Sequence, residues 1–237
     1  MNQLEEINPN LPNPIPYYYL LGKSAKIDKS DKYTDYVNFI MYLAPHTMSG
    51  VNICPFASPG CAASCLNTAG RGKFTMTQKA RLNRTLHYLS DRVGFLQRLR
   101  AEILYHATLH KKIACRLNGT SDLNFNSFIK EVSKMVPHVV WYDYTKNIHQ
   151  AIKALEIPNY HVTFSRSETN EVDCLKALSV GINVAVVFRD KLPKTWNGFD
   201  VIDGDETDAR FLDKSGVVVG LTAKGKGKKD KTGFVVD

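Results

Sequence analysis

Apolar runs of strand length alternate with helix-like patterns along most of the chain. The strand-like runs cover residues 36–44, 113–117, 139–144, 161–164, 184–188, 199–202 and 217–221. Leucines at helical spacing predict helices within residues 73–110, with Asp91 placed to cap the second of them, and further helices at 126–135, 147–155 and 171–179. Strands that alternate with helices through short links are typical of a mostly parallel sheet. We therefore expect an α/β fold whose sheet forms a partial or complete TIM-like barrel.

No repeat or linker divides this pattern, so residues 1–237 are expected to form a single barrel-like domain. Prolines at Pro12, Pro14 and Pro16 favour an extended N-terminal arm over residues 1–16. Near the other end, residues 224–231 form a low-complexity Gly/Lys segment, called the lysine run below. We expect this run to be mobile, or to become ordered only with a ligand.

The formal net charge is +8, and half of it comes from the lysine run, where five lysines stand against one aspartate. The remaining charge is too small to predict a nucleic-acid groove across the body of the protein. A weak nucleic-acid contact through the lysine run stays open. No apolar stretch approaches the ~20 residues that a membrane span needs, and the first residues lack the layout of a signal peptide. These features predict a cytoplasmic protein without membrane contact; they do not indicate an oligomeric state.

Polar and charged side chains gather directly after the predicted strands. In parallel α/β sheets the carboxyl ends of the strands lie at one edge, and ligand sites are built there. Any one of these residues is equally well explained by a strand end that meets water, but the set as a whole favours a small-molecule pocket. The candidate ligand-binding residues are Arg116, Asn118, Asp122, Tyr144, Lys146, Ser165, Arg166, Ser167, Glu168, Asp203, Asp205 and Lys224.

Three cysteines, Cys54, Cys61 and Cys65, lie in a loop rich in Gly, Pro and Ser that follows the first strong strand. Their C-x6-C-x3-C spacing places three thiolates within twelve residues, close enough along the chain to surround one metal centre. In a reducing compartment, a cluster of this kind indicates a metal site more than disulfides.

Thiolate is the preferred ligand of both iron–sulfur clusters and zinc. Structural zinc usually takes four protein ligands, often from C-x2-C pairs, and this loop has neither feature. We therefore expect an iron–sulfur cluster, [4Fe–4S] or [3Fe–4S], with zinc as the alternative. His46 is a possible fourth ligand, although an ordinary loop histidine is the simpler interpretation. Cys115 and Cys174 are predicted to be buried core thiols.

Several short motifs together form a recognisable pattern along nearly the whole chain. They are Cys54-Pro55, Ala57-Ser58-Pro59-Gly60-Cys61, Cys65, Arg116-Leu117-Asn118-Gly119-Thr120-Ser121-Asp122, Tyr144-Thr145-Lys146, Ser165-Arg166-Ser167-Glu168, Asp203-Gly204-Asp205 with Asp208, and Gly220-Leu221-Thr222-Ala223-Lys224-Gly225. In these motifs the chain resembles the gene-product-eighty-eight-like family of bacteriophage proteins. The resemblance implies a phage origin, hence the cytoplasm of an infected host cell, and a shared site at these positions.

The chain is also similar, more distantly, to radical S-adenosylmethionine enzymes. Those enzymes carry a three-cysteine cluster loop after the first strand of a partial barrel, usually with C-x3-C-x2-C spacing. Here Cys61 and Cys65 match the first half of that motif, Thr68 stands at the third position, and Cys54 lies upstream. No Gly-Gly-Glu-Pro-like stretch follows the second strand.

Three functions follow as hypotheses. The first is an iron–sulfur protein of radical-enzyme-like architecture with a ligand pocket at the strand ends, and it assigns no reaction. The second is a non-catalytic redox or electron-transfer module. The third is a zinc-stapled protein that binds nucleic acid through the lysine run. The carboxylates and cations on the cluster face favour the first, because an electron carrier needs little beyond the surroundings of its cluster.

Overall fold

A computed structural model describes residues 19–23 and 25–237, so the expected N-terminal arm, residues 1–16, lies outside the described part of the chain. In chain order its elements are β1 (Leu21–Gly22), α2 (Ala25–Tyr33), β2 (Val37–Met41), α3 (Pro59–Ala63), η1 (Leu66–Thr68), η2 (Gly70–Lys73), α4 (Thr75–Ser90), α5 (Arg92–Leu109), β3 (Ile113–Arg116), α6 (Asn126–Met135), β4 (Val139–Thr145), α7 (Ile148–Ala154), β5 (Tyr160–Ser165), α8 (Glu171–Ser179), β6 (Val184–Phe188), β7 (Thr195–Trp196), β8 (Phe199–Asp203), η3 (Arg210–Leu212), β9 (Val218–Thr222), η4 (Gly225–Lys229) and β10 (Val235–Val236). The η elements are short 3₁₀ helices.

The predicted helices agree closely with these bounds. The expected ranges 126–135 and 171–179 coincide with α6 and α8, and the expected break at Asp91 separates α4 from α5. The Asp91 carboxylate accepts a hydrogen bond from Gly94 N at 2.9 Å, which satisfies a free amide in the first turn of α5. None of the described helices is both long and apolar enough to cross a membrane.

The described strands form one mixed sheet in the order β1-β2-β3-β4-β5-β6-β9-β8-β7, with β10 paired to β6. Every pair from β2 through β8 is parallel, which confirms the α/β class, whereas β1 and β7 are antiparallel additions at the two edges. These two edge strands do not pair with each other, so the sheet stays open and a complete barrel is wrong. Each is only two residues long and continues as loop, which leaves no long edge for closure.

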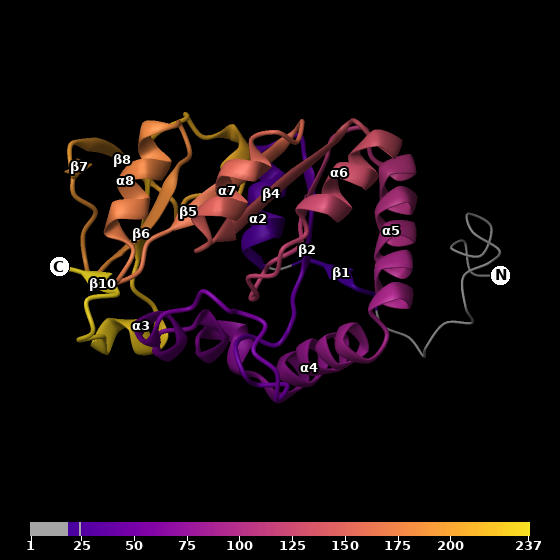
Figure 1. Cartoon of the computed structure of the whole chain (residues 1–237), viewed down its shortest axis with the longest axis horizontal. Coiled ribbons are helices and arrows are strands. Elements are labelled where there is room, and N and C mark those ends of the chain that lie inside the picture. The colour runs from indigo at the N-terminus through magenta and orange to yellow at the C-terminus, as the bar shows by residue number, and fades with distance from the viewer. Residues whose placement is uncertain (1–18, 24) are drawn as a thin grey trace.

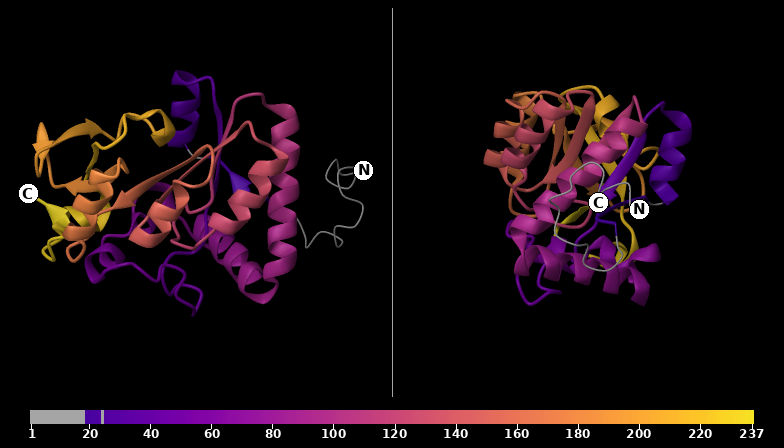
Figure 2. Two further views of the ribbon diagram at one scale, coloured as in Figure 1. Left: turned by 45° about the horizontal axis from the view of Figure 1, so that its top comes forward. Right: turned by 90° about the vertical axis from the view of Figure 1, so that its right-hand side faces the viewer.

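Apolar and polar side chains alternate along β2 and lie on opposite faces of the sheet. On β2, the Phe39 ring stacks on His106 of α5 at 3.9 Å, whereas the amide of the preceding Asn38 donates to Asp31 of α2 at 2.6 Å. The larger core lies on the α5–α6 side and centres on Trp141. Figure 2 shows α2 on the side of the sheet opposite α6 and α7. The sheet is therefore the middle layer, as the alternation of its side chains requires.

The connection from β2 to β3 is much longer than the others and covers the carboxyl edge of the sheet. It begins with the cysteine loop, defined here as residues 46–72, and continues through α4 and α5. In Figure 1, α3 and α4 lie along the lower edge of the molecule, below the ends of the strands. The loop expected to follow the first parallel strand therefore reaches the edge where the other strands deliver their polar residues.

The lysine run, expected to be mobile or to become ordered with a ligand, has a defined conformation in the structure. Residues 225–229 form η4, and Gly225, with φ at +54°, brings the chain so close to the cysteine loop that a Cβ there would meet Ala69 Cβ at 2.9 Å. Arg189 holds the run from the other side by donating to the carbonyls of Lys228 and Asp230 at 3.2 and 3.1 Å. These contacts are far apart in sequence, so composition alone could not reveal them.

After the lysine run the chain returns to the sheet as β10. Strand β5 pairs with β6 only at Val184 and Ala185, whereas β10 pairs with β6 at Val187 and Phe188. The first part of β6 is therefore paired with β5 and its last part with β10. Toward the carboxyl edge, β5 separates from β6. This separation places the C-terminal segment beside the site described next.

Candidate functional site

A cavity of about 840 Å³ opens at the carboxyl edge of the sheet, and the three clustered cysteines line it. The cysteine loop forms one wall, and the ends of the central strands form another. Its volume lies in the range of small-molecule sites, roughly 300–1,000 Å³.

The cysteine loop is held in place by a short helix and a carboxylate from a distant part of the chain. Ser58 caps α3 by accepting a hydrogen bond from Cys61 N at 3.2 Å, and Pro59 occupies the first turn, where no amide is needed. Glu168 accepts from Ser58 Oγ at 2.6 Å and from Gly60 N at 2.7 Å. These bonds lower the pKa of Glu168 even though burial opposes the shift. Glu168 therefore fixes the part of the loop that carries Cys61.

All five cysteines are free. The backbone N–H of His46 donates to Cys54 Sγ at 3.2 Å, and a backbone hydrogen bond from Asn67 reaches the Cys65 thiol. Burial raises the pKa of the Cys54 thiol to about 11 against the effect of that N–H, and burial also raises the pKa of Cys65. Without a metal, both thiols are therefore neutral near pH 7, and binding one would release their protons.

No three His, Cys, Asp or Glu side chains within residues 19–23 and 25–237 are grouped so as to hold a metal ion. This finding supports neither the expected iron–sulfur cluster nor the zinc alternative. The His46 ring lines the cavity, and its Nδ1 lies 3.2 Å from Thr47 Oγ1. Cys115 on β3 and Cys174 on α8 are fully buried in the two main cores, as predicted, and neither lines the cavity.

Most of the predicted ligand-binding residues meet at this cavity. Those that line it are Arg116, Asn118, Asp122, Tyr144, Lys146, Ser165, Asp205 and Lys224. They come from the ends of five strands, β3, β4, β5, β8 and β9, and the loops that follow them, so the polar residues at these parallel strand ends share one cavity.

Four predicted residues do not line the cavity. Arg166 turns to the C-terminal segment and donates to Phe234 O at 3.0 Å, and Glu168 contacts the outer side of the cysteine loop. Ser167 is buried, and its N–H donates to Asn170 Oδ1 at 2.6 Å before α8 begins. Asp203 is exposed and accepts from Asp205 N at 2.8 Å. The first three follow β5, which has separated from β6 at this point, so its loop passes behind the cavity wall.

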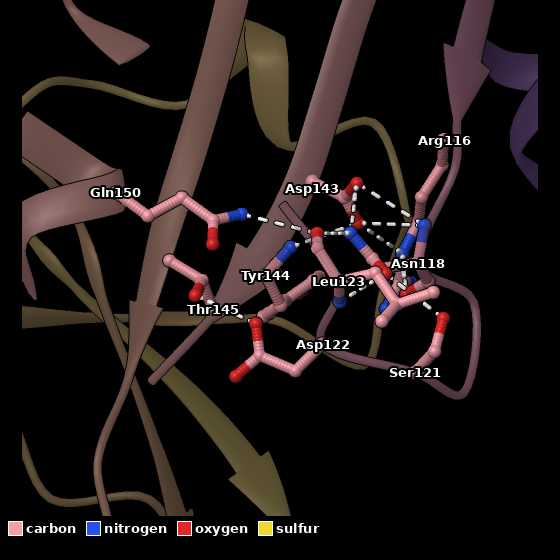
Figure 3. Close-up of polar contacts among 9 residues, drawn as sticks. All are labelled: Arg116, Asn118, Ser121, Asp122, Leu123, Asp143, Tyr144, Thr145 and Gln150. Atoms are coloured by element: carbon pink, nitrogen blue, oxygen red, sulfur yellow. Dashed lines mark hydrogen bonds and ion pairs between the residues drawn. The ribbon is translucent and has the colours of Figure 1, made fainter. Parts of the chain in front are cut away.

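Asn118 is the centre of a buried hydrogen-bond network (Figure 3) rather than a free ligand-binding amide. Its Nδ2 donates to Asp143 Oδ2 and to Leu123 O, both at 3.0 Å, and its Oδ1 accepts from Ser121 Oγ at 2.8 Å and Leu123 N at 2.9 Å. In the same loop, the Asp122 carboxylate accepts from Thr145 Oγ1 at 2.7 Å. Asn118 and Asp122 therefore shape the loop between β3 and α6, and their polar atoms are already satisfied.

Asp143, which the strand-end argument did not single out as a site residue, supports this loop from β4. Burial raises its pKa to about 7, against the opposing effects of Arg116 and Asn118. Arg116 lies 3.7 Å from Asp143 Oδ1 and places its guanidinium over the Tyr144 ring at 4.5 Å. The position of an acidic residue inside an apolar strand was the signal that could have identified it.

The cavity also has basic residues that the search along strand ends missed. Arg81 and Arg84 lie one helical turn apart on α4, and Arg71 precedes them on η2. Arg81 is 8% exposed, lies over the Tyr42 ring at 4.9 Å and hydrogen-bonds to Asn67. The i, i+3 spacing of two arginines directly after the cysteine loop was the available signal.

Fold and site together define the class: an open, mostly parallel α/β protein with a three-cysteine loop over a basic cavity at the carboxyl edge of its sheet. A model of the Gene product 88 family matches residues 19–237, so the chain belongs to that family. This confirms the resemblance to these bacteriophage proteins. No curated protein and no solved structure matches the chain.

Proposed function

We propose that Cys54, Cys61 and Cys65 hold an iron–sulfur cluster, [4Fe–4S] or [3Fe–4S], that faces a small-molecule ligand in the cavity. The observation that supports the proposal most directly is that three free thiols from one loop line a single large cavity. Two of these thiols also receive backbone N–H groups, a contact that stabilises and tunes cluster thiolates. The donor set is chemically that of a cluster site.

The thiolates of an iron–sulfur cluster are arranged differently from the ligands of a single metal ion. Each thiolate of a cubane cluster binds a different iron, so the three sulfurs stand farther apart than the ligands of one ion. The support for a common centre is that all three thiols line one cavity. With three cysteines, one iron of a [4Fe–4S] cluster is left for another ligand, either His46 or a bound small molecule.

The resemblance to radical S-adenosylmethionine enzymes extends the proposal to architecture, a partial TIM-like barrel with the cluster loop after its first parallel strand. A pocket of this size, with several charged residues beside the thiols, favours a ligand-binding cluster protein over a simple electron carrier. Free thiols fit a reducing compartment, which we take to be the cytoplasm of the infected host cell.

The test is anaerobic purification with iron and acid-labile sulfide analysis and an absorption spectrum, recorded with and without S-adenosylmethionine. We expect a brown protein with similar amounts of iron and sulfide. Cys54→Ala, Cys61→Ala and Cys65→Ala should each remove the colour, and Cys115→Ala, which changes a thiol outside the cavity, should keep it. Stoichiometric zinc without sulfide would refute the cluster.

A second candidate function, weak nucleic-acid binding, is favoured by one observation about the lysine run. Lys226, Lys228, Lys229 and Lys231 are all exposed on a defined segment that packs against the cysteine loop. Replacing these four lysines by Gln should weaken DNA binding and reduce its salt dependence, because fewer counterions are released. Absence of salt-dependent binding by the wild type would eliminate this candidate.

A further inference from the structure

We propose that the ligand of the cavity is a phosphate monoester of about nucleotide size, bound by Arg81 and Lys146 beside the cysteine loop. This inference rests on the proposed function in that it takes the cavity as the ligand site. It adds the chemical class of the ligand and the side chains that recognise it. Neither Arg81 nor Lys146 has a carboxylate within ion-pair distance in the described part of the chain.

The cavity wall has a surplus of positive charge. Its cationic side chains are Lys23, Arg71, Arg81, Arg84, Arg116, Lys146 and Lys224, against the carboxylates of Asp122, Asp205 and Asp208. Two more carboxylates, Asp31 and Asp143, pair with Lys23 and Arg116 from behind the wall. Cations still outnumber carboxylates by two among these residues, and a partly enclosed, low-dielectric site concentrates the field of such a surplus on an anion.

An oxidised [4Fe–4S] cluster alone does not neutralise this surplus. A [4Fe–4S]²⁺ core held by three thiolates carries a single net negative charge, which offsets only one of the two excess positive charges. Arg81 and Lys146 line the same cavity as the three thiols, and both act electrostatically on Cys65. An anion bound by these two residues would therefore lie next to the cluster.

Arg81 and Lys146 are positioned by neutral groups, which leaves their charge available to a ligand. The Arg81 guanidinium lies over the Tyr42 ring, and its Nε is buried without a hydrogen-bond partner. Lys146 Nζ donates to Ser165 Oγ at 2.9 Å and lies 5.8 Å from the centre of the Phe234 ring. Arg81 is buried with no carboxylate at ion-pair distance, and Lys146 is partly buried. A buried cation without such a partner is costly, and a phosphate that accepts charge-assisted hydrogen bonds would reduce that cost.

The remainder of the wall suits an organic group attached to the phosphate. Ile40, Val187 and Leu221 provide apolar surface, and the Tyr42 and Phe234 rings lie beside the two cations. Aromatic and apolar surface of this kind packs well against a flat ring. The cavity therefore favours a phosphate ester with an organic part over inorganic phosphate alone.

The test is titration calorimetry of anaerobically purified full-length protein with each of the four ribonucleoside 5′-monophosphates and with the matching neutral nucleosides. We expect at least one monophosphate to bind saturably, and its nucleoside to bind about tenfold more weakly or less, because the charge-assisted contacts are lost. Inorganic phosphate should compete, and added salt should weaken binding.

Variants distinguish this site from general attraction of anions to a basic protein. Arg81→Gln and Lys146→Met should each weaken monophosphate binding about tenfold or more. Arg81→Lys, which keeps the positive charge, should retain part of the wild-type affinity. Lys153→Gln removes an exposed cation on α7, outside the cavity, and should leave binding unchanged. The inference would be overturned if all these variants bound the monophosphate as tightly as the wild type. It would also be overturned if the protein showed no preference for monophosphates over nucleosides.

Iron and sulfide measured on the same preparations separate the two proposals. A brown protein with a full complement of iron that binds no monophosphate would refute the ligand class and leave the cluster proposal intact. A colourless protein that binds a monophosphate through Arg81 and Lys146 would refute the cluster and support the ligand class.

Discussion

Replacing Asn118 by Ala tests whether the buried network beneath the cavity determines its shape. The side chain makes four hydrogen bonds, to Asp143, to Ser121 and to both backbone groups of Leu123, and the residue is only 2% exposed. In the variant, the Asp143 carboxylate still accepts a hydrogen bond from the backbone N–H of residue 118, and Leu123 O still accepts one from Gln150 Nε2 at 3.3 Å. Two donors, the Leu123 N–H and the Ser121 hydroxyl, lose the partner that the wild type provides.

Each buried polar group left without a partner costs ~1–3 kcal/mol, so the variant should lose ~2–6 kcal/mol of unfolding free energy. That is a large part of the ~5–15 kcal/mol by which domains are usually stable. Urea denaturation followed by the fluorescence of buried Trp141 measures the loss. Asn124→Ala is the matched control, because this exposed amide in the same loop accepts one bond, from Asn126 N, and should cost about 1 kcal/mol or less.

The loop that Asn118 holds also lines the cavity, and the Cys54 thiol donates to Thr120 O within it at 3.7 Å. Iron retention should therefore fall in Asn118→Ala even under conditions where the protein remains folded. The reasoning is refuted if Asn118→Ala and Asn124→Ala have the same urea midpoint and the same iron content.

The remaining predictions concern the support of the cysteine loop and the core thiols. In Gly60→Ala the new methyl would meet Phe234 Cβ at 2.6 Å and Glu168 Oε1 at 2.9 Å. Thermal unfolding should show a loss of ~1–3 kcal/mol from overpacking, which unchanged stability would contradict; Gly22→Ala, whose Cβ meets nothing within 4 Å, is the control. Because the folded-state pKa of Glu168 is lowered, its contribution to stability is complete above the usual value of 4.5 and is lost as pH falls through the folded value. Hydrogen exchange at the Gly60 amide, corrected for the intrinsic pH dependence of exchange, should therefore become faster on acidification. Glu168→Gln should abolish this acceleration. An equal acceleration in the variant would show that Glu168 is not the titrating group. Cys115→Ser and Cys174→Ser should each keep the iron and cost ~1–3 kcal/mol in urea denaturation for burying a hydroxyl; loss of iron in either would identify it as a cluster ligand.

Local periodicity determined much of the fold. Helices α6 and α8 begin and end where their apolar spacing predicted, because each depends on one amphipathic face. Cys115 and Cys174 are buried because they lie within apolar patterns. The location of the cavity was also predictable, since parallel strands deliver their carboxyl ends to one edge.

Tertiary structure decided which residues at that edge form the cavity and which support it. Asn118 and Glu168 have side chains typical of ligand-binding residues, yet their hydrogen bonds are used on Leu123 and on the cysteine loop. Arg81 reaches the cavity from α4, which is not a strand end, so no rule about strand ends could include it.

The open sheet and the ordered lysine run were likewise beyond the sequence pattern. Strands β1, β7 and β10 have two residues each, too few to show an alternation of apolar and polar positions. Strand β10 replaces β5 beside the end of β6, and η4 packs against the cysteine loop through contacts between segments far apart in the chain. Periodicity reports which face of one element is buried, whereas these pairings depend on the free energy of contacts that form only when the whole chain is folded.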